Sequence, residues 1–141
     1  MSDRILVPYD GSEPSEKALE YTFETFPDAD VTVLYVVPIP EGYWAAFEEP
    51  EDRIPDADEA RDRGRDILDE ATAIAEEHGH DTDTEVALGK PDHQIVDRAA
   101  DEAYDTIVIG SHGREGVSRV LLGSVAENVV RRSPIPVVVV R

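Results

Sequence analysis

The residues best suited to chemistry lie in a glycine-rich stretch near the end of the chain. Gly110, Gly113 and Gly123 divide this stretch, and Ser124 directly follows the third glycine. Because glycine has no Cβ, the backbone can turn sharply at these positions and can approach a ligand closely. Residues 106–109, just before the loop, form a β-branched apolar run that is typical of a strand buried on both faces. The pattern therefore predicts a buried strand followed by a loop that a ligand can approach.

A helix is expected after the loop. Ser124 and Glu127 have the Ser-x-x-Glu spacing of a capping box, which predicts that the helix begins at Ser124. We expect Val125 and Val129, and by extension Val130, to face the core. Free N–H groups and the positive end of the dipole at a helix start both favour phosphate. The same cap would form if Ser124 only closed its own helix, so the pattern fits an anion site and a structural turn equally well.

Few side chains near the loop are suited to covalent chemistry. The Walker sequence is absent, and neither Lys17 nor Lys90 lies in the loop, so the chain is not a P-loop ATPase. His112 has no evident orienting partner in the sequence, as a catalytic base would need. Arg114 could form a forked pair with phosphate or could balance Glu115 at the surface. We therefore expect no catalytic residues, and at most slow hydrolysis of a bound nucleotide.

Composition limits the protein to a few classes. Its 141 residues suit one domain with its own hydrophobic core. There is no cysteine, so disulfides and thiolate chemistry are excluded. The beginning of the chain has no apolar signal region, and no apolar run approaches the roughly 18 residues of a membrane-spanning helix. We therefore expect a cytoplasmic protein with no membrane partner.

The charge balance is strongly acidic, with 13 Lys and Arg against 32 Asp and Glu and a net charge of −19. Duplex nucleic acid would be repelled, so we expect no nucleic-acid partner. The lysine-poor composition resembles that of halophilic proteins, whose surface repulsion is screened in molar salt. Acidic runs such as residues 56–59 fit a solvated surface better than a metal site, so we expect no metal bound by side chains.

The elements around the loop alternate between strands and helices. Apolar runs predict strands at residues 4–9, 31–37, 84–88, 106–109 and 137–140. Start signals and helical spacing predict helices that begin at Ser12 or Ser15, at Ala57, at Pro91 and at Ser124. This order favours an α/β fold, a single doubly wound five-stranded parallel sheet of the flavodoxin or Rossmann type, with strand order 3-2-1-4-5 and helices on both faces.

In this topology the first and fourth strands are neighbours, and the strand order reverses between them. Ligands of such sheets bind at that point, beyond the carboxyl ends of the strands. These ends are Tyr9 with Asp10 and Ile109 with Gly110. Asp10 could accept hydrogen bonds from ribose hydroxyls or an adenine amine, or it could form the turn before Gly11. The site predicted from topology thus coincides with the glycine loop.

The glycine spacing resembles a known signature. Gly110, two residues, Gly113, nine residues and then Gly123 with Ser124 is similar to the nucleotide-binding motif of the universal stress protein family, in its ATP-binding branch. Further resemblance lies in residues 4–12, in Gly89, Lys90 and Pro91 with Ile95, and in residues 133–141. The resemblance covers residues 1–141 as a single domain, apart from the segment between Pro38 and Pro55.

The resemblance implies a bound ATP, accompanied by Mg²⁺, and a homodimer formed through Val137–Val140. It also implies main-chain contacts to adenine from Val36, contacts near the base or ribose from Ile109 and Gly110, and phosphate contacts from the later glycines. The residues expected to bind the nucleotide are Pro8, Tyr9, Asp10, Val36, Ile109, Gly110, Gly113, Arg114, Gly123, Ser124 and Val125.

The leading functional hypothesis is a cytoplasmic ATP-binding stress-response protein that acts as a nucleotide-dependent dimeric switch or adaptor for an unknown protein partner. The segment 43–47, with Trp44, would either anchor a long loop to the core or cover the bound base. One alternative is a nucleotide-free dimeric interaction module. Another is a weak ATP-hydrolysing or phosphoryl-transfer enzyme on the same scaffold.

Overall fold

Five parallel strands form one sheet in the computed structural model, which describes residues 3–38, 57–112 and 122–141. The strand order is β3-β2-β1-β4-β5. The strands are β1 (Arg4–Pro8), β2 (Asp30–Pro38), β3 (Asp83–Gly89), β4 (Thr106–Gly110) and β5 (Val137–Val140). The predicted fold class and strand order are therefore confirmed. Residues 43–47, predicted either to anchor a loop to the core or to cover the base, lie outside the described residues.

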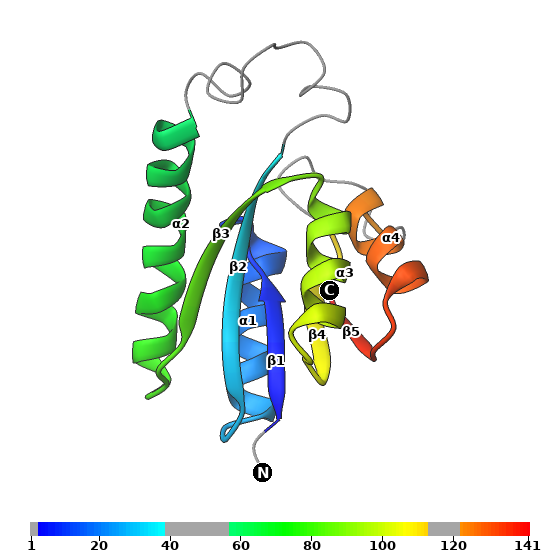
Figure 1. The fold of residues 1–141 in the computed structure, drawn as a ribbon. Coiled ribbons are helices and arrows are strands. Elements are labelled where there is room, and N and C mark those ends of the chain that lie inside the picture. Colours follow the sequence, from blue (N-terminus) through cyan, green and yellow to red (C-terminus); the bar gives the residue numbers. More distant parts are fainter. Residues whose placement is uncertain (1–2, 39–56, 113–121) are drawn as a thin grey trace.

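Helices cover both faces of this sheet (Figure 1). The helices are α1 (Glu13–Thr25), α2 (Ala57–Glu77), α3 (Pro91–Asp101) and α4 (Ser124–Arg132). α1 and α2 pack on one face, and α3 and α4 pack on the other. Of the two starts predicted for α1, the structure has Ser12, which is the N-cap residue. No helix in the described part of the chain is long and apolar enough to cross a membrane.

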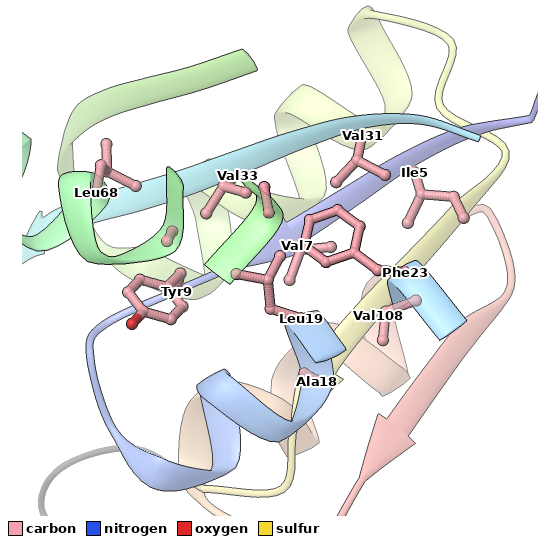
Figure 2. Close-up of a cluster of buried hydrophobic side chains, with 12 residues drawn as sticks. Ile5, Val7, Tyr9, Ala18, Leu19, Phe23, Val31, Val33, Leu68 and Val108 are labelled. Carbon is pink, nitrogen blue, oxygen red and sulfur yellow. The ribbon is translucent and has the colours of Figure 1, made fainter. Parts of the chain in front are cut away.

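Alternate residues of each strand supply the two hydrophobic cores. On β1, Ile5 and Val7 face α1 and α2, where they meet Leu19 and Phe23 (Figure 2). Leu6, between them, faces α3 and α4. All three β1 side chains are fully buried. A strand buried on both faces must be apolar at every position, which explains the unbroken apolar runs in the sequence.

The long helix α2 lies close against the sheet because of a glycine in its middle. A Cβ on Gly64 would lie 2.9 Å from the ring of Tyr35 on β2 and 3.2 Å from Val86 on β3. Glycine costs a helix about 1 kcal/mol relative to alanine. Here that cost is offset by the close approach of the helix to β2 and β3. Gly79, with φ +71°, then ends the helical segment in the left-handed conformation.

Candidate functional site

The carboxyl ends of β1 and β4 lie side by side, as the topology predicted. The two strands are parallel neighbours, with Leu6 opposite Ile107. Each strand leads through a turn or loop into a helix, so two strand-to-helix junctions meet at this edge of the sheet. We call them the first junction, residues 8–15, and the second junction, residues 110–124. Residues 113–121 of the second junction, which include Gly113 and Arg114, lie outside the described residues.

The first junction is closed by its own side chains. Asp10 Oδ1 accepts a hydrogen bond from the Ser12 N–H at 3.0 Å, and Gly11 between them has φ +80°. Ser12 Oγ accepts from the Ser15 N–H at 3.4 Å, and Ser15 Oγ donates to the Ser12 carbonyl at 2.8 Å. The turn-forming role of Asp10 is therefore confirmed. Its contact with a ligand stays a prediction.

Gly110 joins the two junctions by close packing. A Cβ on this residue would lie 2.7 Å from the backbone carbonyl carbon of Pro14, in the first turn of α1. Such a separation is too short for any side chain. The sequence indicated a glycine that lets a ligand approach. The structure shows in addition that the absent Cβ makes room for the start of α1 against the end of β4.

The helix after the second junction begins at Ser124, as predicted, but it is capped by a different residue. The Glu127 N–H donates to the carbonyl of Gly123 at 2.9 Å, and Gly123 is the N-cap residue of α4. Among the described residues no side chain accepts a hydrogen bond at this cap, so the predicted capping role of Ser124 is wrong. Ser124 is the first residue of the helix and is exposed. Because the cap residue is a glycine, it offers no side-chain acceptor of its own to the first N–H groups of α4.

Backbone hydrogen bonds hold the two ends of the second junction together. The Gly123 N–H donates to the Ser111 carbonyl at 2.8 Å, and the Ser111 N–H donates to Val140 on β5 at 2.9 Å. The start of α4 is thereby tied to the ends of β4 and β5. Ser111 and the adjacent His112 were not among the predicted site residues, yet they lie at the base of this loop.

The residues of α4 that face the core also differ in part from the prediction. Val129 is fully buried and Ala126 is 2% exposed, whereas Val130 is 45% exposed. Val125 is partly buried against the same cluster. Successive helical residues differ by about 100° in direction, so a helix that buries Val129 turns Val130 toward solvent. The expectation that Val130 faces the core is therefore wrong.

The apolar residues expected near the base and ribose lie on one face of the sheet. Val36 and Ile109 both belong to the cluster under α3 and α4, with exposed fractions of 8% and 5%. Pro8 is the last residue of β1, a position at which its missing N–H costs the sheet the fewest hydrogen bonds. Tyr9 points to the opposite face, toward α1 and α2 (Figure 2). Any contact of Tyr9 with a nucleotide would therefore come from its main chain.

The hydroxyl of Tyr9 is buried without a hydrogen-bond partner among the described residues. Burial raises the pKa of Tyr9, and the negative charges of Glu16, Glu70 and Asp10 raise it further. Each of these effects disfavours the phenolate. Tyr9 is therefore a neutral core residue at physiological pH.

The prediction of the site did not use one signal in the sequence, which is the excess of arginine over acidic residues near the end of the chain. From Thr106 onward the chain carries five arginines but only two acidic residues, although the protein as a whole has a net charge of −19. The arginines are Arg114, Arg119, Arg131, Arg132 and Arg141. A local excess of positive charge in the segment that contains the second junction favours an anionic ligand there.

The fold and the reversal of strand order at these two junctions define an α/β protein of the flavodoxin-like class. Within that class the chain belongs to the universal stress protein family, because the model described as "Universal stress protein family" matches residues 1–141. This chain is 33% identical over 147 residues to Universal stress protein MJ0531 of Methanocaldococcus jannaschii, and the match covers 98% of this chain and 81% of that protein.

Solved structures agree with this assignment. The solved structure of protein MJ0577 superposes on this chain with a TM-score of 0.81 at 31% identity, covering 99% of this chain and 96% of that one. A universal stress protein named MJ0577, from M. jannaschii, is also among the relatives of this chain. A universal stress protein solved in complex with cAMP has a TM-score of 0.66 and 25% identity, with coverage of 99% and 96%. Structural neighbours of the chain thus include a protein that binds an adenine nucleotide.

Proposed function

We propose that this protein binds an adenine nucleotide, with ATP as the main ligand, at the edge where the two junctions meet. The observation that carries the proposal is the start of α4, where the cap residue is a glycine and no side chain of the described residues accepts a hydrogen bond from the first N–H groups. Phosphate is the ligand that such a helix start favours, through its N–H groups and its dipole. The cAMP complex of a structural neighbour supports the adenine part of the proposal.

The residues present fit this ligand. Val36 would contact the adenine through its main chain, Ile109 would lie near the base or ribose, and Asp10 follows β1 at the same edge. Gly123, Ser124 and Val125 begin α4, where the phosphates would lie. Among the described residues there is no group of three or more His, Cys, Asp or Glu suited to a metal. A Mg²⁺ ion would therefore be held mainly by the phosphates and water.

We further propose that the protein works in the cytoplasm as a dimeric switch or adaptor in the stress response. β5 pairs only with β4 within the described sheet, and its valines are partly buried. An apolar edge strand of this kind favours pairing with a second copy through Val137–Val140. Nucleotide occupancy would change a surface that another protein recognises.

The test is ATP titration calorimetry in molar potassium chloride with magnesium, combined with light scattering to measure mass. The native chain is compared with Ser124→Asp, which places a carboxylate at the first position of α4. We expect saturable binding by a native dimer and at least about tenfold weaker binding by the variant, because the added charge repels phosphate. The same charge at a helix start should leave the fold intact or slightly more stable.

The matched control is Ala73→Asp, which adds the same charge at an exposed position of α2, on the other face of the sheet. This variant should bind ATP as the native chain does. Absence of binding by a folded native dimer would refute the nucleotide proposal and favour the nucleotide-free interaction module. A native monomer would refute the dimer.

A further inference from the structure

A histidine in the first turn of α3 joins this helix to the end of α4, which packs beside it (Figure 1). The Arg132 guanidinium bonds to His93 Nε2, and the two nitrogens are 2.9 Å apart. Because an arginine side chain can only donate, Nε2 is the acceptor and the neutral ring carries its proton on Nδ1. Arg132 is the last residue of α4, so this bond links the beginning of one helix to the end of the other.

The carboxylate of Asp92 lies close to this bond and has an unused acceptor. Asp92 is 3% exposed, and its Oδ2 is buried without a hydrogen-bond partner among the described residues. The same oxygen is 3.9 Å from His93 Nε2. This distance is too long for a hydrogen bond, but a movement of about 1 Å would give the length of a charge-assisted one. A buried carboxylate oxygen without a donor is unfavourable, so a proton on Nε2 would satisfy it.

Protonation of His93 would therefore exchange its partner. An imidazolium ring donates from both nitrogens and accepts at neither. Nε2–H and the Arg132 guanidinium would then be two positively charged donors in contact, and their bond would be lost. Asp92 Oδ2 is an acceptor of opposite charge within reach of a small ring movement. Histidine is the side chain whose charge ordinarily changes between pH 5 and 8.

Other charged groups around α3 leave this balance to Arg132 and Asp92. α3 packs against α4, β3 and β2, and β2 contributes the apolar Leu34 and Val36 to the shared cluster. The two ion pairs among these groups are neutral overall, and the remaining two groups have opposite charges. They are Lys90 and Asp97, three residues before and four after His93, the pair Glu127 and Arg131 on α4, and the pair Glu85 and Arg98 between β3 and α3.

We propose that His93 is a pH-sensitive switch between α3 and α4. The neutral ring accepts a hydrogen bond from Arg132 and holds the two helices together. The protonated ring releases Arg132 and donates to Asp92, so a contact between helices is replaced by one within α3. The released guanidinium lies at the surface, at the end of the helix that leads into β5. The switch does not depend on the proposed nucleotide function.

The first measurement is a series of long-range ¹H–¹⁵N spectra of the whole chain in molar potassium chloride, from pH 8 to pH 5. At pH 8 the His93 ring should be the Nδ1–H tautomer, and at pH 5 both ring nitrogens should be protonated. The Arg132 side-chain resonances should move with the same pH midpoint. Because Asp92 is buried, salt screens its pair with His93 only weakly, and the exchange should persist in this buffer.

Asp92→Asn tests the acceptor of the protonated ring. This change keeps the size of the side chain and removes its charge, so the imidazolium loses its carboxylate partner. The pH midpoint should fall by at least about half a unit. At pH 8 the Nδ1–H tautomer should be the same as in the native chain, because Arg132 still donates to Nε2.

Arg132→Ala tests the partner of the neutral ring, and does so even if Asp92→Asn fails to fold. The ring should become a mixture of tautomers at pH 8, and the midpoint should rise by about half a unit because a neighbouring positive charge is gone. The matched control is Arg131→Ala, which removes the adjacent exposed arginine that pairs with Glu127. This control should keep the tautomer and should hold the midpoint within about 0.2 unit, since molar salt screens exposed charges.

Three results would overturn the proposal. An Nε2–H tautomer of native His93 at pH 8 would show that Arg132 does not donate to the ring. The same midpoint in Asp92→Asn as in the native chain would remove Asp92 as the second partner. Equal shifts in Arg131→Ala and Arg132→Ala would reduce the effect to the general charge of the surface.

Discussion

The two junctions at the carboxyl edge of the sheet join a strand to a helix in opposite ways. In the first, the side chains of Asp10, Ser12 and Ser15 satisfy the turn and the start of α1. In the second, the N-cap residue of α4 is Gly123, and no side chain of the described residues caps the helix. Both junctions follow buried parallel strands, so the difference does not come from their place in the fold. It comes from the residues at the helix start.

This difference separates a structural helix start from one that is open to a ligand. A helix leaves its first N–H groups without intrahelical partners, and those groups take side chains, water or ligands. At α1 a side chain already fills part of this role, and two acidic residues, Glu13 and Glu16, lie in the first turn. The first turn of α4 has one, Glu127, which pairs with Arg131. Among the described residues no side chain caps α4, so the second junction is better suited to phosphate than the first.

The strongest test of the comparison is Gly110→Ala, because Gly110 lies at the contact between the two junctions. Its new Cβ would lie 2.7 Å from the Pro14 carbonyl carbon, and backbone atoms cannot move aside as a flexible side chain would. We expect a loss of about 3 kcal/mol in the free energy of unfolding, or failure to fold. Urea unfolding in molar potassium chloride measures this change.

The control for this substitution is Gly79→Ala. Gly79 has φ +71° and open space around its Cβ position, so alanine there should cost only about 1 kcal/mol of backbone strain. Equal losses in the two variants would contradict the packing role of Gly110.

A smaller effect is expected from a pair of serines. Ser12→Ala removes the side-chain cap of α1 and should lower the free energy of unfolding by about 1 kcal/mol. Ser124→Ala removes no cap bond and should change it by less than about 0.5 kcal/mol. Urea unfolding of both variants tests the difference. A larger loss of unfolding free energy in Ser124→Ala than in Ser12→Ala would contradict the assignment of the side-chain cap to the first junction.

The smallest effect concerns Tyr9, which lies in the first junction and has a buried hydroxyl with no hydrogen-bond partner among the described residues. Tyr9→Phe should be nearly neutral at pH 7, because it removes an unpaired polar group from the core. The folded-state pKa of Tyr9 lies above its ordinary value of 10.0. Its stabilising contribution is therefore fully present below pH 10 and is lost as the pH rises beyond it, when the unfolded chain ionises first.

The measurement is the midpoint of urea unfolding at neutral pH and above pH 10. Tyr9→Phe should lose less stability on alkalinisation than the native chain. The exposed Tyr21 supplies the control, because Tyr21→Phe should follow the native chain at both pH values. Parallel pH profiles for the native chain and Tyr9→Phe would contradict the burial of an unpaired hydroxyl.

The sequence by itself determined the fold and predicted the edge of the sheet at which the candidate site lies. Unbroken apolar runs and helical spacing predicted the alternation of strands and helices, and right-handed crossovers are compatible with the strand order that the structure has. The start of α2 and the bounds of β5 match the prediction, because residue periodicity and proline are local signals. Gly110 and Gly123 also lie at the two ends of the loop, as their spacing indicated.

Only the tertiary structure decided how the junctions work. The cap at Gly123 and the contact of Gly110 with Pro14 both depend on distances between backbone segments. A Ser-x-x-Glu pattern permits a capping box but does not require one, since the loop before the helix sets where its first turn begins. Local sequence chose the elements. The tertiary structure decided where the first turn of α4 begins and so which residue caps it.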